Sequence, residues 1–180
     1  MNESIYADHA ATTPLEPEAW EAMRPWLTES FANPAALYRS GLAAHRAVEE
    51  ARRTVARCLG CSPAGIFFTS GGSESNTWAI LSGAARQGPG SREMITTPIE
   101  PPPVSGACRF LHDRGLAVHT LPVDQWGRVD TADLEQALRR HPRMVTIQYA
   151  NNEVGTIQDV PAIAALCRAQ EIPLHLDAVQ

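Results

Sequence analysis

The sequence lacks lysine completely, because all 15 of its Lys-plus-Arg residues are arginines in a chain of 180 residues. A covalent imine between a lysine of this chain and a carbonyl compound is therefore excluded. The sequence also lacks any apolar run near the roughly 18 residues that a membrane span requires. Its first residues, MNESIYADHAATTP, are polar and acidic, so we expect neither a secretory signal nor a membrane partner.

Cysteine and positive charge are scarce as well. The four cysteines show neither the density of a disulfide scaffold nor the paired spacing of a zinc site, which favours the reducing cytoplasm and no bound metal. The 15 arginines face 20 acidic residues, so the formal net charge is −5 and nucleic acid is an unfavourable partner. A hydrophobic fraction of 44% with 19% charged residues is typical of a folded domain.

Helical and strand-like patterns alternate along the chain. Helical patterns cover residues 17–29, 40–59, 74–86, 104–114, 131–140 and 160–170. Strand-like runs cover residues 66–69, 93–97, 116–121, 144–149 and 172–177. This alternation indicates βαβ units, and hence an α/β fold with a mainly parallel sheet and flanking helices. Ligands of such sheets bind beyond the carboxyl ends of the strands, where we expect the functional residues.

Two helix ends can be predicted from single residues. Gly60 follows the amphipathic pattern of residues 40–59 and has the freedom in φ that a helix C-terminus uses. Asp130 or Thr131 is expected to cap the N-terminus of the helix at 131–140, because an oxygen of either side chain can accept a free backbone N–H.

The loop after the first expected strand suits an anionic group. Residues 70–76 read SGGSESN and lead into a helix. Glycines let a ligand approach the backbone, and a helix start offers free N–H groups and a positive dipole end, so the loop suits a phosphate. The loop matches neither the dinucleotide fingerprint nor the P-loop, so it implies no particular nucleotide. A helix cap, in which Ser73 serves only its own helix, explains the same residues equally well.

Polar residues also follow the last two expected strands. Asn151 and Asn152 come after the run at 144–149, and paired asparagines at such a place often form turns. Asp177 ends the last run, and a buried carboxylate is expensive without a partner. One suitable partner is the protonated ring nitrogen of pyridoxal phosphate. His175 shares a strand face with Asp177, and a satisfied core histidine is the simpler interpretation of it.

Five blocks of sequence, in order, resemble the cysteine desulfurases, which are pyridoxal-phosphate enzymes that remove sulfur from L-cysteine. The blocks are YADHAATTP at 6–14, FANP at 31–34, FTSGGSESN at 68–76, YANNEVG at 149–155 and HLDAVQ at 175–180. The resemblance spans essentially the whole chain and implies the large domain of fold-type-I pyridoxal-phosphate transferases, in the class V aminotransferase branch. It implies an N-terminal segment at 1–14 on the small-domain side and a partial cofactor-binding large domain at 15–180, with the C-terminal part absent.

The resemblance assigns roles in binding pyridoxal 5′-phosphate to five residues. Gly72 and Ser73 would hold the phosphate. Asn152 and Gln180 would contact the region of the phenolic oxygen, and Asp177 would pair with the pyridinium nitrogen. These roles agree with the expectation reached from the strand ends.

Three departures from the family pattern limit what the resemblance implies. The family's Thr-Glu-His segment matches Ile99-Glu100-Pro101 here, so Pro101 replaces a histidine that stacks on the cofactor ring and is a candidate for proton transfer. The family's Schiff-base lysine belongs to a Ser-x-His-Lys block beyond Gln180, and its sulfur-accepting cysteine lies later still. We therefore expect no catalytic residue in this chain, and no activity by the chain alone.

The leading hypothesis is a cytoplasmic, cysteine desulfurase-like chain that binds pyridoxal phosphate without a covalent bond. The family reaction converts L-cysteine to alanine and an enzyme persulfide, and it feeds iron-sulfur cluster assembly. The resemblance implies a homodimer, with a complementing C-terminal chain or a sulfur-acceptor protein as candidate partners. The chain is then a truncated product, an incomplete gene product or a piece of a split protein. The alternatives are another class V enzyme, such as a selenocysteine lyase or an aminotransferase, and a non-catalytic remnant or interaction module.

The resemblance also predicts which strands lack neighbours. It implies a seven-stranded sheet in which strands that follow Gln180 lie between the run at 66–69 and the run at 172–177. In this chain the first run would lose its neighbours, and the last run would form an exposed edge of the sheet. Unpaired edges favour association, so we expect the chain to aggregate, to dimerise or to need a complementary polypeptide.

Overall fold

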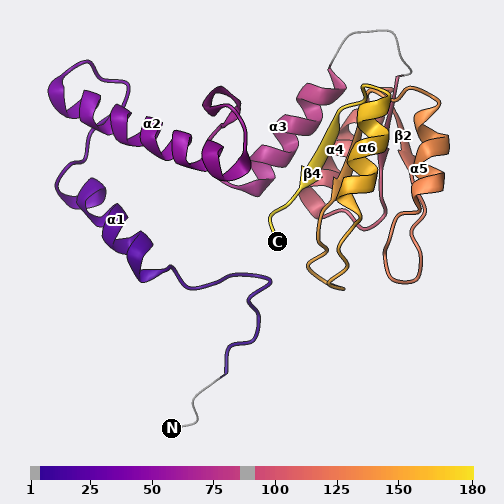
Figure 1. Cartoon of the computed structure of the whole chain (residues 1–180), viewed down its shortest axis with the longest axis horizontal. Helices are drawn as coiled ribbons and strands as arrows, with labels where there is room; N and C mark the ends of the chain where they lie inside the picture. The colour runs from indigo at the N-terminus through magenta and orange to yellow at the C-terminus, as the bar shows by residue number, and fades with distance from the viewer. Residues whose placement is uncertain (1–4, 86–91) are drawn as a thin grey trace. The chain divides into compact units, whose positions relative to one another are not determined.

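The computed structural model describes residues 5–85 and 92–180, and the chain divides into two compact units, Met1–Phe68 and Thr69–Gln180. Figure 1 colours the chain from its N-terminus to its C-terminus and labels its helices and strands. Among the described residues, no helix combines the length and the apolar character needed to cross a membrane. The predicted division into 1–14 and 15–180 follows family domains, so it stays a prediction.

The first unit is helical. Its elements are helices α1 (Pro17–Thr28) and α2 (Arg39–Leu59) and the short 3₁₀ helix η1 (Pro63–Gly65). Helix α2 ends at Gly60, whose φ of 66° is left-handed, so this helix end is confirmed. The buried residues among those described in this unit are small: Gly41, Ala44 and Ala56. The unit therefore has little apolar core of its own.

The prediction of a strand at residues 66–69 is wrong. Ile66 has extended backbone angles, but no ladder forms along these residues. Extended backbone becomes a strand only when a neighbouring strand takes up its N–H and C=O groups. Here the groups of Ile66 have other partners: its N–H donates to the Pro63 carbonyl, and Arg52 of α2 donates to the Ile66 carbonyl. The guanidinium of Arg52 lies 5.0 Å from the Phe68 ring centroid. The apolar pattern thus indicated the backbone conformation and not the pairing.

The second unit contains a four-stranded parallel sheet, which confirms the predicted α/β class. The strands are β1 (Glu93–Thr96), β2 (Ala117–Thr120), β3 (Met144–Gln148) and β4 (Leu174–Asp177), in the spatial order β2-β1-β3-β4. All neighbouring pairs are parallel. Strand β4 is an edge strand among the described residues, as we expected for the run at 172–177.

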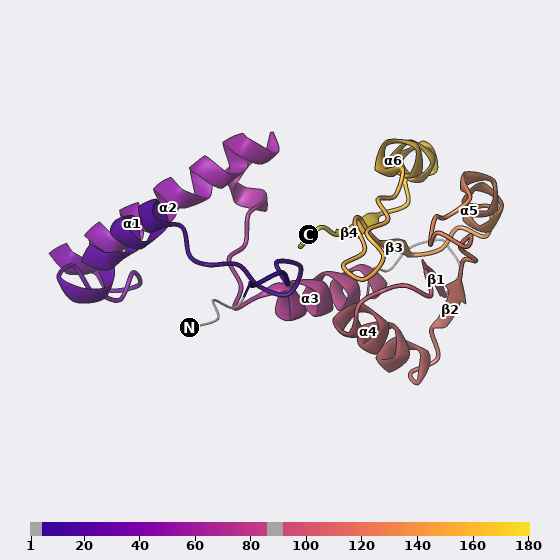
Figure 2. The ribbon, with the colours of Figure 1, turned by 90° about the horizontal axis from the view of Figure 1, so that it is seen from below.

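Four helices cover the two faces of this sheet. They are α3 (Gly72–Ala84), α4 (Pro102–His112), α5 (Thr131–Leu138) and α6 (Val160–Ala169). Helices α3 and α4 pack on one face, and α5 and α6 pack on the other (Figure 2). Helix α4 begins two residues earlier than predicted, because proline is tolerated in the first turn of a helix. The last residue of the helix predicted at 74–86 lies outside the described residues.

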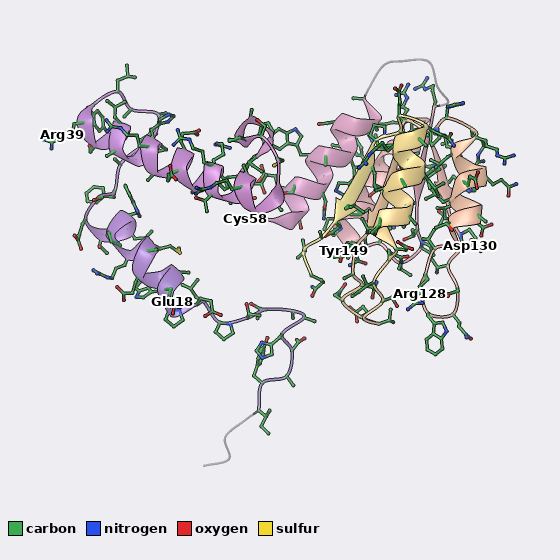
Figure 3. All side chains as sticks on the ribbon, viewed as in Figure 1. Glu18, Arg39, Cys58, Arg128, Asp130 and Tyr149 are labelled. Atoms are coloured by element: carbon green, nitrogen blue, oxygen red, sulfur yellow. The ribbon has the colours of Figure 1, made fainter. Side chains whose placement is uncertain are left out.

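The predicted cap of α5 is confirmed. Asp130, labelled in Figure 3, occupies the N-cap position, and its Oδ1 accepts the Ala132 N–H at 2.8 Å. Asp159 caps α6 in the same way, with its Oδ1 3.1 Å from the Ala162 nitrogen. Each carboxylate satisfies a backbone donor that a helix start leaves free.

The strand residues alternate between the two faces. Val145 and Ile147 of β3 belong to the apolar cluster beneath α5 and α6, whereas Met144 belongs to the cluster beneath α3 and α4. Register places Thr146 beside His175 and Gln148 beside Asp177 on that second face. The face covered by α3 and α4 is therefore apolar at the start of the strands and polar at their carboxyl ends, where ligands of parallel sheets bind.

Candidate functional site

The strand order of the second unit reverses between β1 and β3. The chain passes from β1 outward to β2, and later from β3 outward to β4 on the other side. Register pairs join β1 to β3 only as far as Ile95 and Val145, whereas β3 stays paired with β4 up to Gln148 and Asp177. Ligands of open parallel sheets bind outside the carboxyl ends of strands where the order reverses. The candidate site is therefore at this end of the sheet, between β1, β3, β4 and the start of α3.

Asp177 is buried at the carboxyl end of β4. Its side chain is held by two neutral donors: Asn76 Nδ2 donates to Oδ2 at 2.7 Å, and the Val179 N–H donates to Oδ1 at 3.1 Å. The ion pairs found among the described residues involve other carboxylates. Within the described part of the chain, the expected partner of Asp177 is thus an amide and a backbone N–H rather than a cation. A buried carboxylate with neutral donors only can still accept a positively charged group.

The start of α3 offers free backbone donors. The N-cap is Gly71, which has no side chain to cap the helix, and the first intrahelical bond runs from the Ser75 nitrogen to the Gly71 oxygen at 3.1 Å. The N–H groups of Gly72 and Ser73 precede this bond, so they have no acceptor within the helix. The alternative in which Ser73 caps its own helix is therefore wrong. Free N–H groups and the positive end of the helix dipole suit an anion.

Side chains hold the loop before α3 in place. Glu74 Oε2 accepts both the hydroxyl and the N–H of Ser70 at 2.6 Å, and these two bonds hold the pKa of Glu74 below its usual range. The Thr69 and Ser75 hydroxyl oxygens lie 2.7 Å apart. The Glu74 carboxylate is thus engaged with Ser70, and side-chain hydrogen bonds link the loop to the first turn of α3.

The segment after β4 packs against the start of α3. A Cβ built on Gly72 would lie 3.1 Å from Val179 Cγ2, which is closer than most real contacts. Because Asn76 lies on the same helix and binds Asp177, the helix start and the carboxylate belong to one packed arrangement. This arrangement fits a group with an anionic end and a cationic end, since free N–H groups stand at one place and a carboxylate at the other.

The loop after β3 is built around Asn151, as the turn interpretation predicts. The buried Asn151 accepts the N–H groups of Glu153 and Val154 through Oδ1, at 2.9 and 3.0 Å. Its Nδ2 donates to Gln148 Oε1 at 3.0 Å, and Gln148 Nε2 lies 3.4 Å from Asn152 Oδ1. Tyr149, labelled in Figure 3, follows β3 at the start of this loop. Asn151 is thus a turn-forming residue, and the exposed Asn152 is the asparagine available to a ligand.

Glu100 is an additional acid in the site. Its Oε1 accepts the Thr97 hydroxyl at 2.7 Å and the Gln148 N–H at 2.9 Å. Glu100 therefore hydrogen-bonds the backbone of β3 beyond the point where β1 and β3 stop pairing. Its Oε2 is buried and has no hydrogen-bond partner among the described residues. Burial raises the pKa of Glu100 from 4.5 to about 7, and the negative charge of Asp177 adds to this effect. Glu100 therefore exchanges a proton near neutral pH.

Two further residues near these acids are Pro101 and His175. Pro101, which we expected at the position of the family histidine, is the N-cap of α4. His175 Nδ1 lies 2.7 Å from the Thr146 hydroxyl, and burial lowers the pKa of His175 although the Asp177 charge opposes this effect. His175 is thus half-buried and bonded through Nδ1, and its burial disfavours the protonated form.

The structure brings some predicted residues together and adds others. Gly72 and Ser73 share helix α3 with Asn76, which binds Asp177, whereas Asn152 belongs to the loop after β3 and Gln180 lies exposed three residues after Asp177. Sequence reasoning assigned no role to Asn76, Gln148 or Glu100. Asn76 stands three positions after Ser73 within the polar run that opens α3, so no local pattern distinguished it from its neighbours. The bonds of Gln148 and Glu100 depend on how far β1 and β3 stay paired, which no local pattern shows.

Comparisons with known proteins agree on one family. Residues 5–180 match the family model described as aminotransferase class-V. The chain is 41% identical over 180 residues to the cysteine desulfurase IscS of Dictyoglomus turgidum, and this match covers 100% of this chain and 46% of that protein. It is 40% identical over 179 residues to the cysteine desulfurase IscS of Methanosarcina thermophila, and this match covers 99% of this chain and 44% of that protein.

Solved structures give the same result. A structure described as a NifS-like protein matches with a TM-score of 0.91 and 37% identity, over 96% of this chain and 48% of that one. A structure described as SspA in complex with cysteine matches with a TM-score of 0.90 and 36% identity, over 98% of this chain and 51% of that one. The chain spans about half the length of these relatives and resembles their N-terminal part.

Proposed function

Because the chain belongs to the class-V aminotransferase family, we propose that it is the cofactor-binding part of a cysteine desulfurase, with pyridoxal phosphate as cofactor and L-cysteine as substrate. One observation carries this proposal. Among the described residues, the hydrogen bonds to the buried carboxylate of Asp177 come from neutral donors, and one of these donors, Asn76, lies on the helix whose first N–H groups have no acceptor within the helix. Pyridoxal phosphate carries the two complementary groups, which are a phosphate and a ring nitrogen that can be protonated.

The residues of this chain would bind the two ends of the cofactor. The backbone N–H groups of Gly72 and Ser73 would donate to the phosphate, as helix starts do for anions. Asp177 would hold the proton on the ring nitrogen through a charge-assisted hydrogen bond. Asn152 and Gln180 would bind on the side of the phenolic oxygen. When bound, the cofactor supplies the electron sink for amino-acid chemistry.

We expect this chain to hold the cofactor without a covalent bond, since it has no lysine. In this proposal, residues 15–180 are part of the large domain and 1–14 belong to the small-domain side. The lysine and the persulfide-forming cysteine come from further polypeptide, in a cytoplasmic homodimer that serves iron-sulfur cluster assembly. The structure titled as a complex with cysteine is similar to this chain over 98% of its length, which supports L-cysteine as the substrate.

A second candidate function is a non-catalytic binding module. It is favoured by Pro101, which stands where the family has a histidine and which here starts α4. A proline side chain can neither donate nor accept a proton. In this candidate the cofactor cradle around Asp177 is retained after the proton-transfer residue has been lost.

The test is a titration of the 180-residue chain with pyridoxal 5′-phosphate, followed by fluorescence. Borohydride reduction and peptide mass mapping then locate any covalent label. We expect saturable binding with no stoichiometric adduct at an internal residue, although the N-terminal amine can react adventitiously. A chain that does not bind the cofactor, or that carries a stoichiometric internal adduct, would contradict the proposal.

The same titration tests Asp177. We expect Asp177→Ala to weaken binding at least tenfold, because a hydrogen bond to a charged group contributes roughly 1.5–3 kcal/mol. The matched control is Glu135→Ala, which removes an exposed carboxylate of α5. Equal affinities of the two variants would leave Asp177 with a purely structural role.

A further inference from the structure

Asn76 joins the two ends of the proposed site. Its Nδ2 donates to Asp177 Oδ2 at 2.7 Å, across 101 positions of sequence. Both side chains are 6% exposed, so the bond is shielded from water. The remaining oxygen of the carboxylate accepts the Val179 N–H at 3.1 Å. With one donor on each oxygen, the plane of the carboxylate is held from two directions.

The position of Asn76 on α3 gives this bond its significance. Asn76 lies three residues after Ser73 on one helix, which corresponds to about 4.5 Å along the helix axis at about 1.5 Å per residue. The free N–H groups at the helix start and the amide that holds Asp177 therefore belong to one rigid element. No flexible loop separates the anion-binding donors from the group that positions the carboxylate.

The groups around Asp177 do not neutralise its charge. Glu100, from the turn before α4, lies close enough for the two negative charges to interact, and His175 of β4 lies on the same face. Burial lowers the pKa of His175 and so disfavours a positive charge beside the carboxylate. An amide donor can orient the carboxylate and leave its negative charge for a ligand, which an arginine at the same place would neutralise.

We propose that Asn76 is a positioning residue that holds Asp177 at a set distance from the start of α3, so that the site selects rigid ligands carrying both an anionic group and a protonated aromatic nitrogen. The ligand class rests on the proposed function, whereas the positioning of Asp177 does not. Without the Asn76 amide, the Val179 N–H is the remaining donor to the carboxylate among the described residues, and the carboxylate can turn toward other donors. Binding at the nitrogen end then weakens, while the helix start keeps its own donors.

Three probes separate the two ends of the site. Pyridoxamine 5′-phosphate carries both groups and needs no lysine, pyridoxamine carries the ring nitrogen without the phosphate, and inorganic phosphate carries the anion alone. Each is titrated into the wild-type 180-residue chain and into Asn76→Ala. Thr77→Ala, the neighbouring half-buried position of α3, is the matched control. Asn76→Gln keeps the amide but displaces it by one methylene.

We expect Asn76→Ala to lose about tenfold in affinity for pyridoxamine 5′-phosphate and for pyridoxamine, with inorganic phosphate unchanged. Asn76→Gln should recover part of the loss, because its amide can still donate, and Thr77→Ala should bind all three probes like the wild type. An equal loss for all three probes, or no loss for any, would overturn the inference. Failure of the wild type to bind pyridoxamine 5′-phosphate would instead overturn the proposed function.

A measurement without a ligand decides the positioning role in every case. In ¹H–¹⁵N spectra, the side-chain amide signal of Asn76 should shift when Asp177→Asn removes the charge of its acceptor. The Asn33 side-chain signal is the internal control, because the Oδ1 of Asn33 accepts the Ala35 N–H within the first unit. An Asn76 signal that does not respond to Asp177→Asn would overturn the inference even if the chain binds the cofactor.

Discussion

The two units of the chain use apolar residues in opposite ways. In the second unit, Ile147 of β3 is 0% exposed and belongs to a continuous apolar cluster. In the first unit, Trp26 is 42% and Leu37 is 89% exposed, and the buried residues are glycine or alanine. A helical pattern in the sequence therefore does not guarantee a core. The helices of the first unit have apolar stripes, but within that unit few residues cover them.

The two units also differ in whether a side chain caps the start of each helix. Helices α5 and α6 begin with Asp130 and Asp159, whose carboxylates accept backbone N–H groups. Helices α1 and α2 begin after Glu16 and Tyr38, which make no such bond. In the second unit local signals and tertiary packing support the same structure, which is the consistency expected of a stable fold. We therefore expect the second unit to be the more stable one.

The largest difference in stability between the two units is expected from a substitution in the apolar core. Ile147→Ala leaves a cavity in the apolar cluster of the second unit, so we expect it to cost about 2–5 kcal/mol in the free energy of unfolding of that unit. Leu37→Ala removes an exposed side chain of the first unit and should cost less than about 0.5 kcal/mol. Hydrogen exchange followed by mass spectrometry reports each unit separately. Similar costs at both positions would show that the first unit has a core.

Glu100 should make the stability of the second unit depend on pH. Its pKa is raised from 4.5 to about 7 in the folded chain, so the folded state binds the proton more tightly than the unfolded state. Stability should therefore fall as pH rises from about 4.5 to about 7, by roughly 3 kcal/mol at about 1.4 kcal/mol per pH unit. Glu100→Gln should remove this loss. The measurement is denaturant unfolding of both proteins at several pH values.

The difference between the two unfolding curves isolates Glu100. The lowered pKa of His175 has the opposite sign, since the protonated histidine favours the unfolded state and stability is lost as pH falls below about 6.5. His175 is present in both proteins, so its contribution cancels in the difference. Glu135→Gln is the control for loss of an exposed carboxylate. A difference that does not change between pH 5 and pH 8 would show that Glu100 keeps an ordinary pKa.

Substitutions at the helix caps are expected to give the smallest difference in stability between the two units. Asp130→Ala removes the side chain that accepts the Ala132 N–H, so we expect a cost of about 1 kcal/mol. Glu16→Ala, at the N-cap of α1, removes no cap bond and should change stability by only about 0.3 kcal/mol. Exchange rates of the first-turn amides of α5 and α1 measure these effects. Equal changes at the two helix starts would show that the side-chain caps do not account for the difference in stability between the units.

Much of the second unit could be predicted because its elements have strong local signals. Each of its four strands falls within the predicted runs, and Asp130 marks the start of α5 as expected. Residues 66–69 had an equally clear apolar run and yet form no strand. Their conformation depended on a partner strand, which a local pattern cannot supply. The error thus falls where pairing, rather than propensity, decides the structure.

The sequence by itself determined the order of helices and strands in the second unit, the absence of a lysine amine, and the presence of Asp177 and a glycine-rich helix start at strand ends. These features are local, since they depend on the residue types of one segment. Only the tertiary structure decided that Asn76 holds Asp177 and that Glu100 bonds the backbone of Gln148. These pairs are 101 and 48 positions apart, and their contact depends on strand register and on where β1 leaves β3. The chemical groups of the site can therefore be identified from the sequence, whereas their hydrogen-bond partners and the raised pKa of Glu100 depend on burial and packing.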